Sequence, residues 1–167
     1  MFVRTSSMKN LLTKEIKQNP QQNLEKPDDK VQKNMTNQDK VTQFMKTFGQ
    51  EVKSSPDWPE EKVMQLRLEL IEEEVEELFD GVDRRDMTNV AKELIDILYV
   101  VYGMGCSLGI DLDACFDEVH KSNMSKLQDG EVLYSASGKV LKGKNYFEPE
   151  IDRILLQQPT RMNIGQP

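Results

Sequence analysis

The sequence predicts an all-α protein: a four-helix-bundle-like domain followed by an irregular loop or short hairpin. Two observations lead to this class. From about residue 41 onward, apolar residues recur at three- and four-residue spacing, the period of helices that bury one face. Residue types that start and stop helices bracket these segments. No segment approaches the roughly 18 apolar residues that indicate a membrane span, so we expect no membrane partner.

The first helix is expected to begin after Thr36, because a threonine hydroxyl can accept a hydrogen bond from a free N–H of the first turn. Gly49 is expected to end it. The apolar residues of this segment have helical spacing and are Val41, Phe44, Met45 and Phe48. Before it, the stretch NPQQNLEKPDDKVQKN is polar and has no core-forming period. We therefore predict that residues 1–35 are a disordered leader.

The second helix is expected to run from Asp57, a good N-cap, to Phe79. Pro59 suits its first turn, and Asp80-Gly81 is expected to end it. At ~1.5 Å per residue this helix would be about 35 Å long. The short segment GVDRRD then leads to a third helix that ends near Gly109. So short a link makes the two helices antiparallel neighbours.

A fourth helix is expected to begin near Asp113 and to stop near Asp129-Gly130. The following segment, VLYSASGKVLKGKNYFEPE, contains glycines, small residues and lysines, which predicts a loop or irregular hairpin. Pro149 is expected to open a last short helix. We thus divide the chain into a leader (1–35), one folded domain (36–156) and a tail (157–167).

The composition argues against several classes of protein. A net charge of −7 and a pI near 4.9 are unusual for proteins that bind a nucleic-acid polymer. Cys106 and Cys115 lie in or beside helical segments, which argues against a disulfide framework and favours a reducing compartment. We therefore expect a cytoplasmic location. Organellar targeting by the leader is the alternative, but Arg4 is the only arginine of the opening MFVRTSSMKNLLTKEIK.

Two acidic residues lie inside the most apolar helix, VAKELIDILYVVYGMG. Glu93 and Asp96 are three residues apart and therefore share one face. An ionised carboxylate removed from water is costly unless it is paired or binds a metal. One explanation is a buried ion pair with Lys92 or Arg67. The other is a metal site.

The second helix carries a run of acids, ELIEEEVEEL. Such a run is usually a solvated face, and we assign Glu72 and Glu76 to that role. Glu73 and Glu74 precede Glu77 by four and three residues, so these three project from neighbouring positions. If the two antiparallel helices bring their acids together, the carboxylates should not all stay ionised without cations.

Oxygen ligands without histidine point to Mg²⁺, or to Mn²⁺, as the cation. His120 is the only histidine of the chain. A di-iron carboxylate bundle requires Glu-x-x-His on two helices, and a single histidine cannot supply both. The sequence therefore favours a magnesium-type site over zinc or di-iron.

The fourth helix and the loop after it carry the remaining polar candidates. Asn123 and Lys126 are three residues apart, so they form either a phosphate or base contact or an exposed polar flank. Lys139 and Lys142 flank glycines of the loop. They either close over phosphates or are solvated loop charges.

The ordered segments EEEVEEL, ELIDILYVVYG and VHKSNMSK resemble the MazG-like all-α nucleoside triphosphate pyrophosphatase superfamily. The resemblance covers roughly residues 38–147 and is greatest for the branch with phosphoribosyl-ATP pyrophosphatase-like and dUTPase-like members. It implies a MazG fold and a homodimer or dimer of dimers. It also implies Mg²⁺-dependent hydrolysis of a nucleoside triphosphate between the α and β phosphates, giving a monophosphate and pyrophosphate in nucleotide-pool house-cleaning.

Residue by residue, the resemblance implies metal binding by the acids of the first two motifs, which are Glu73, Glu74, Glu77, Glu93 and Asp96. Glu74 would also orient or deprotonate the attacking water. Asn123 and Lys126 would contact the nucleotide and its phosphates, with Lys139 and Lys142 from the loop. Similarity to the dUTPase-like members favours a pyrimidine deoxynucleotide such as dUTP or dCTP.

Two alternatives remain open at this point. The first is phosphoribosyl-ATP as the substrate. The second is a non-catalytic helical interaction module, in which the glutamates confer solubility and the buried acids form an interface network. A shared fold cannot exclude this second alternative.

Overall fold

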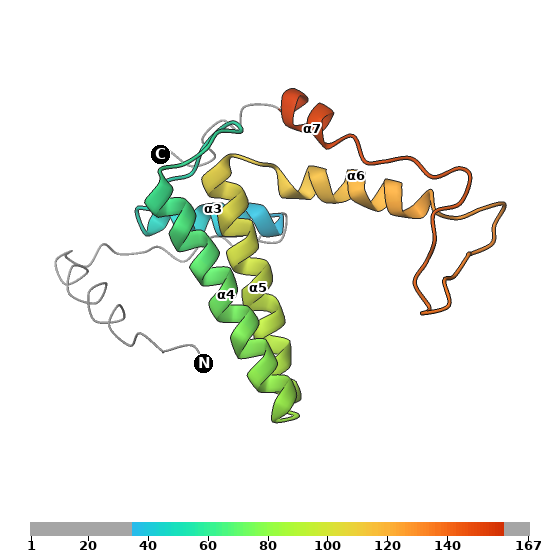
Figure 1. The fold of residues 1–167 in the computed structure, drawn as a ribbon. Helices are drawn as coiled ribbons and strands as arrows, with labels where there is room; N and C mark the ends of the chain where they lie inside the picture. The colour runs from blue at the N-terminus through green and yellow to red at the C-terminus, as the bar shows by residue number, and fades with distance from the viewer. Residues whose placement is uncertain (1–34, 159–167) are drawn as a thin grey trace. The chain divides into compact units, whose positions relative to one another are not determined.

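The structure, a computed structural model, describes residues 35–158. Within this range the chain forms helices and no strands (Figure 1), which confirms the all-α class. The helices are α3 (Asn37–Thr47), α4 (Glu61–Asp83), α5 (Met87–Leu108), α6 (Leu112–Met124) and α7 (Ile151–Gln157). Except for Met35, the predicted leader lies outside the described residues, as do residues 159–167 of the predicted tail.

Helix α3 begins where the sequence predicts. The Thr36 hydroxyl accepts a hydrogen bond from Asp39 N (3.2 Å), and the Asp39 carboxylate accepts one from Thr36 N (3.1 Å). This reciprocal capping box satisfies two N–H groups that have no partner inside the helix. Val41 and Met45 are buried. The helix ends at Thr47, close to the predicted stop at Gly49.

Helix α4 begins later and ends later than the sequence predicts. Asp57 does not cap it, because the helix starts four residues later, at Glu61, and the Asp57 carboxylate pairs with Lys53 Nζ (2.8 Å). At the other end the helix continues through Gly81 to Asp83. A Cβ atom at Gly81 would lie 2.8 Å from Asn89 Nδ2. The glycine therefore permits close contact between α4 and α5 and does not stop the helix.

Helix α5 has the predicted antiparallel link to α4 and the predicted end. The Asp86 carboxylate caps its start by accepting from Thr88 N and Asn89 N, both at 3.1 Å. Gly109 follows its last residue in the left-handed region, at φ 68°. A Cβ at Gly109 would collide with the Ser55 carbonyl, so both the backbone conformation and the neighbouring segment require glycine there.

At the break after α5 the helical axis bends by 111° into α6. The Asp111 carboxylate caps α6 by accepting from Ala114 N (3.0 Å). The helix ends at Met124, before the predicted stop at Asp129-Gly130. Here the Ser125 hydroxyl donates to Ser122 O (2.7 Å) and accepts from Phe147 N (3.1 Å). These bonds tie the chain to the returning loop in place of a further helical turn.

The segment between α6 and α7 is irregular, as predicted, with isolated antiparallel bridges Gln128–Glu131 and Tyr134–Val140. Helix α7 follows Pro149 at the predicted place and is held against α6. The buried Glu118 carboxylate accepts from Glu150 N (3.2 Å) and lies 3.8 Å from the Arg153 guanidinium. Among the described residues, no single helix has both the length and the apolar content of a membrane span; only the bent pair α5–α6 passes by length and composition.

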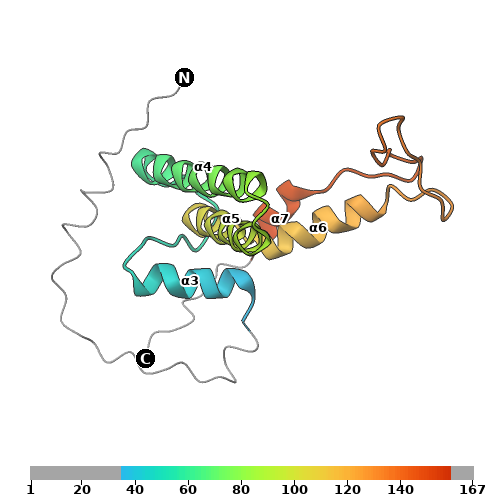
Figure 2. The ribbon, with the colours of Figure 1, turned by 90° about the horizontal axis from the view of Figure 1, so that it is seen from below.

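Helix α5 lies between α4 and α3, as the second view shows (Figure 2). The buried apolar residues of this junction are Val41, Met45 and Cys106. The guanidinium of Arg67 on α4 enters the same region with only 6% exposure. It donates to Ser107 Oγ and to Gln50 Oε1, both at 2.9 Å. Burial lowers the pKa of Arg67, and these bonds join α4, α5 and the segment after α3.

We predict that Arg67→Leu lowers the free energy of unfolding by about 2–4 kcal/mol, because it leaves the buried Ser107 hydroxyl without its donor and also removes the hydrogen bond to Gln50. Urea unfolding followed by circular dichroism measures this loss. The matched control is Arg84→Leu, which removes an exposed ion pair with Asp80 and should change stability by less than about 1 kcal/mol. Equal effects of the two changes would contradict the role given to Arg67.

Candidate metal centre

Acidic side chains from α4 and α5 meet in the half of the helix pair that is nearer to the α4–α5 turn. Glu74 and Glu77 of α4 and Glu93 of α5 each place a carboxylate oxygen within 4.8 Å of the other two. Glu93 is 2% exposed, Glu74 is partly buried and Glu77 is exposed. Residues three apart on α4 share a face, and the antiparallel neighbour supplies the third acid. The group is therefore open on one side and buried on the other.

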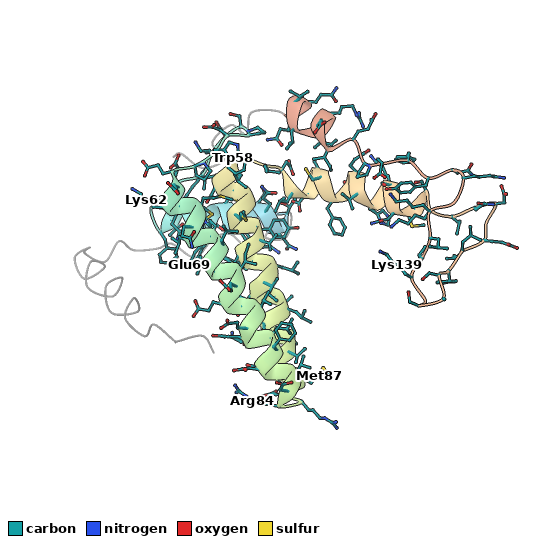
Figure 3. All side chains as sticks on the ribbon, viewed as in Figure 1. Trp58, Lys62, Glu69, Arg84, Met87 and Lys139 are labelled. Carbon is teal, nitrogen blue, oxygen red and sulfur yellow. The ribbon has the colours of Figure 1, made fainter. Side chains whose placement is uncertain are left out.

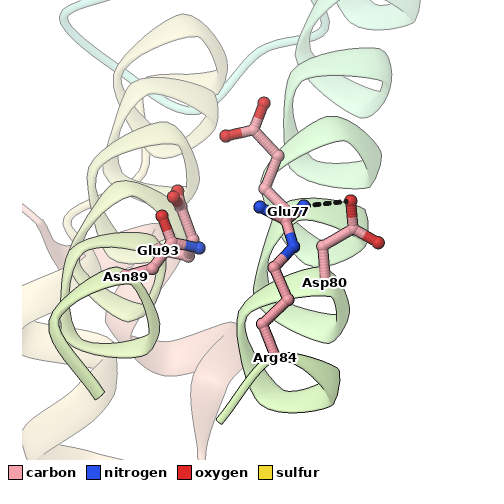
Figure 4. A pocket seen from close by; sticks show the side chains of 5 residues that line it. All are labelled: Glu77, Asp80, Arg84, Asn89 and Glu93. Atoms are coloured by element: carbon pink, nitrogen blue, oxygen red, sulfur yellow. Dashed lines mark hydrogen bonds and ion pairs between the residues drawn. The ribbon is translucent and has the colours of Figure 1, made fainter. Parts of the chain in front are cut away.

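A hollow of about 260 Å³ adjoins these acids and is lined by Glu77, Asp80, Arg84, Asn89 and Glu93 (Figure 4). In this view the side chains of Asn89 and Glu93 on α5 face those of Glu77 on α4 and of Arg84, the residue that follows α4. The Arg84 guanidinium donates a hydrogen bond to the Asp80 carboxylate at 3.0 Å.

Arg84 and Met87 mark the α4–α5 turn, whereas Trp58 lies at the opposite end of the helix pair (Figure 3).

The pKa of Glu74 is raised above its ordinary value of 4.5. Burial is the main cause, followed by the negative charge of Asp96 and then that of Glu77. The charge of Lys92 acts in the opposite direction. Asp96 therefore belongs electrostatically to the same acid cluster, which we define as Glu74, Glu77, Glu93 and Asp96.

Lys92 is the cation that faces the acid cluster. Its Nζ donates to both oxygens of Glu93 (3.1 and 2.9 Å) and to Asp96 Oδ2 (2.7 Å). The hydrogen bonds to Asp96 and then to Glu93 raise the pKa of Lys92. Of the two ion-pair partners that the sequence suggests for Glu93 and Asp96, the structure uses Lys92, while Arg67 bonds Ser107 and Gln50.

The donors of the acid cluster fit Mg²⁺ or Mn²⁺. Both are hard cations that take carboxylate oxygens, and Mg²⁺ is commonly bound through only one or two carboxylates plus substrate phosphates. Glu74, Glu77 and Glu93 supply such oxygens close together, and Asp96 lies beside them. A cation would also offset the repulsion that raises the pKa of Glu74.

The other predicted site residues lie outside this group. Glu73 is exposed on α4. Lys126 Nζ donates to Asn123 Oδ1 (2.6 Å) at the end of α6, and α6 leads away from the α4–α5 pair (Figure 1). The structure thus does not bring Asn123 and Lys126 to the acids of the same chain, and the roles of these three residues stay predictions.

The two loop lysines also lie apart from the acid cluster. Lys142 Nζ pairs with Glu148 (2.6 Å) and lies 4.2 Å from the centre of the Tyr146 ring. Lys139 is exposed on the loop. Closure of this loop over a substrate and the phosphate contacts of both lysines stay predictions.

The sequence interpretation missed three residues that line the hollow, although their spacing contains a signal. Asp80 follows Glu77 by three residues and Arg84 follows it by seven, so both lie on the same face of α4. Asn89 precedes Glu93 by four residues and shares its face of α5. Arg84 and Asn89 provide hydrogen-bond donors next to the acids, which suits an anionic ligand.

Comparison with known proteins gives two matches. Residues 41–123 match the sequence profile of the family described as phosphoribosyl-ATP pyrophosphohydrolase. An uncharacterized protein of Acanthamoeba polyphaga mimivirus is 42% identical over 84 residues, which is 47% of this chain and 33% of the viral protein. The chain thus spans about a third of that curated relative. The matched range runs from α3 into α6 and contains the acid cluster of α4 and α5.

We predict that Glu74→Gln stabilises the metal-free protein at pH 7. The raised pKa means that the folded state favours protonated Glu74. In the wild type, the stability that protonated Glu74 contributes is complete below pH 4.5 and is lost as the pH rises through the raised pKa. Glutamine is neutral at every pH and should raise the unfolding midpoint at pH 7 by about 1–3 °C. Thermal unfolding of both proteins in EDTA measures this difference in the unfolding midpoint.

The pH dependence is the control for this prediction. At pH 4 and below, wild type and Glu74→Gln should unfold at the same temperature, since both then carry a neutral side chain. A variant that is less stable than wild type at pH 7 without divalent cations would contradict the repulsion argued here.

Proposed function

Because residues 41–123 belong to the phosphoribosyl-ATP pyrophosphohydrolase family, within the MazG-like all-α nucleoside triphosphate pyrophosphatase superfamily, we propose that this chain hydrolyses a nucleoside triphosphate between its α and β phosphates. The family match supports a pyrophosphohydrolase-type activity. The products of the proposed reaction are a nucleoside monophosphate and pyrophosphate, and the proposed role is removal of unwanted nucleotides from the pool.

The acid cluster between α4 and α5 is the observation that carries this proposal. Phosphoryl transfer requires positioning and charge neutralisation more than a protein nucleophile. When bound, Mg²⁺ supplies charge neutralisation and a template for the attacking and leaving oxygens. In this proposal the chain holds the metal through Glu74, Glu77, Glu93 and Asp96, with Glu73 as a further candidate ligand. The rigid helix pair fixes the spacing of these carboxylates.

Glu74 is the best candidate to orient or deprotonate the attacking water. A general base works best when its pKa approaches the working pH, and burial together with the neighbouring acids raises the pKa of Glu74 in that direction. Glu74 is only partly buried. Arg84 and Asn89 line the adjoining hollow and are placed to bind phosphate oxygens.

For the substrate, we propose a pyrimidine deoxynucleotide such as dUTP or dCTP, on the similarity of the motifs to dUTPase-like members. The second candidate is phosphoribosyl-ATP, which is favoured by the description of the matching family. A non-catalytic interaction module is the third, and it predicts neither metal binding nor turnover.

We also propose that the chain works as a homodimer or a dimer of dimers. The face of α5 opposite Glu93 carries Met87, Ala91, Leu94 and Leu98 at heptad-like spacing. In the single chain Met87 is 79%, Leu94 49% and Leu98 50% exposed. An apolar row of this kind on a long helix is typical of an interface. A second copy would also supply an Asn123–Lys126 pair, which α6 carries away from the acids of its own chain.

The first test is a panel of nucleoside and deoxynucleoside triphosphates and phosphoribosyl-ATP, with and without Mg²⁺. We expect pyrophosphate and a monophosphate only with the metal, fastest with dUTP or dCTP. Glu74→Gln should lower kcat by about 10²–10⁴-fold, the usual contribution of a general base. Product identification by ion-exchange chromatography and kcat measurement provide the readouts.

Glu76→Gln is the matched control, because Glu76 is an exposed glutamate of the same helix outside the acid cluster. It should retain wild-type kcat. Fastest turnover of phosphoribosyl-ATP would select the second candidate substrate. No turnover of any compound, or normal turnover by Glu74→Gln, would contradict the proposal.

A second prediction concerns assembly. Leu94→Glu and Leu98→Glu introduce charge into the apolar row of α5 and should shift the protein to a 19.3 kDa monomer in sedimentation experiments, whereas wild type should sediment as a dimer or tetramer. Leu156→Glu on α7, where the leucine is 87% exposed, should leave the assembly unchanged. A monomeric wild-type chain would contradict the proposed interface.

A further inference from the structure

Lys92 occupies the position from which a cation neutralises the acid cluster. It precedes Glu93 by one residue and Asp96 by four, and its ammonium bridges the two carboxylates with contacts of 2.7–3.1 Å. Both oxygens of Glu93 take part. A second cation bound to the Glu93 oxygens would therefore lie close to this ammonium and repel it.

The two partners differ sharply in exposure. The Glu93 side chain is 2% exposed, whereas the Lys92 side chain is 58% exposed. If the Lys92 side chain moves away, an ionised Glu93 needs another positive charge, because a buried carboxylate without a partner strongly destabilises the fold. The lysine has no such requirement, since its long flexible side chain can extend into water.

The remaining cation at the hollow is not a substitute for Lys92. Arg84 pairs with Asp80 at 3.0 Å, one turn beyond Glu77 and towards the α4–α5 turn. Arg67, on the same helix as Glu74, donates to Ser107 and Gln50 at the α3 junction. Among the described residues, ion pairs with Glu93 and Asp96 come from Lys92.

We propose that Lys92 is a built-in counter-ion that a divalent cation displaces when it binds. Metal loading is then an exchange, in which the ammonium leaves Glu93 and Asp96 and the metal takes their oxygens. The inference rests on the proposed metal site, and it adds a residue that sets metal affinity. Lys92 keeps the metal-free fold stable and weakens metal binding by the same interaction.

The test is Mn²⁺ binding to the purified chain without nucleotide, measured by electron paramagnetic resonance of free Mn²⁺. Lys92→Gln removes the competing charge and should bind Mn²⁺ at least about fivefold more tightly than wild type, the lower end of typical coupling between two ligands. Lys92→Arg keeps the positive charge, and its guanidinium can donate two parallel hydrogen bonds to a carboxylate. The Lys92→Arg protein should therefore bind Mn²⁺ no more tightly than wild type.

Thermal unfolding gives an independent readout. In EDTA, Lys92→Gln should unfold at a lower temperature than wild type, because Glu93 loses its counter-ion. Saturating Mn²⁺ should remove this deficit. Lys62→Gln is the matched control, since Lys62 is an exposed lysine of α4 paired with Glu60 at 2.7 Å and distant from the acid cluster in sequence. It should change neither Mn²⁺ affinity nor the effect of metal on unfolding.

A measurement on the unmutated side chain covers the case in which Lys92→Gln does not fold. The Lys92 side-chain resonances, assigned with Lys92→Arg, should move to the position of a solvated lysine when Mg²⁺ saturates the wild-type chain. Unmoved resonances, or Mn²⁺ affinity that is equal or weaker in Lys92→Gln, would overturn the exchange. Absence of Mn²⁺ binding to wild type would also overturn it.

The outcomes separate this inference from the proposed reaction. Exchange of Lys92 for metal in a chain that hydrolyses no triphosphate would leave the inference standing and reject the reaction. Hydrolysis of a triphosphate by a chain in which Mg²⁺ leaves the Lys92 resonances unmoved would support the reaction and reject the inference.

Discussion

The repulsion between carboxylates held together by α4 and α5 is the constraint on which the rest of the structure depends. Glu74, Glu77 and Glu93 lie within 4.8 Å of one another, and Asp96 adds to the charge. Burial, and after it the charges of Asp96 and Glu77, raise the pKa of Glu74, and the repulsion among these acids opposes close helix packing. The fold offsets it with one lysine, and the proposed function offsets it with metal. A cation site requires acidic oxygens held close together, and in the metal-free fold their repulsion is destabilising.

The helix pair withstands this repulsion because it is fixed on both sides of the acids. At one end, Gly81 lets α4 and α5 approach so closely that a Cβ would meet Asn89, and Asp86 caps the first turn of α5. At the other end, the buried Arg67 guanidinium joins α4 to Ser107 of α5. These contacts oppose separation of the helices, which would otherwise relieve the repulsion of the carboxylates. Rigid placement of this kind is what phosphoryl transfer demands of a protein.

The two faces of α5 carry different kinds of side chain. One face carries Asn89, Glu93 and Asp96 toward α4, while the other carries an apolar row that the single chain leaves exposed. The bend into α6 then carries Asn123 and Lys126 away from the acids of the same chain. A proposed second copy accounts for both features at once, because it would cover the apolar row and supply polar groups to the site. Lys92 lies at the border of the acidic face, half in water, where it can exchange with a cation.

The sequence by itself determined the helices and the candidate acids. Helical periodicity, the N-cap at Thr36 and the glycine after α5 depend on neighbours in the chain, so they are readable from local residues. Glu93 and Asp96 stood out because charge in an apolar helix is costly wherever the helix packs. Tertiary structure alone decided the rest. Gly81 is a contact and not a helix stop because α5 approaches it. Asp57 is not a cap because Lys53 pairs with its carboxylate. Lys92 rather than Arg67 pairs with the acids. Each of these outcomes depends on a partner that is distant in sequence or on a choice between competing neighbours, which local spacing does not specify.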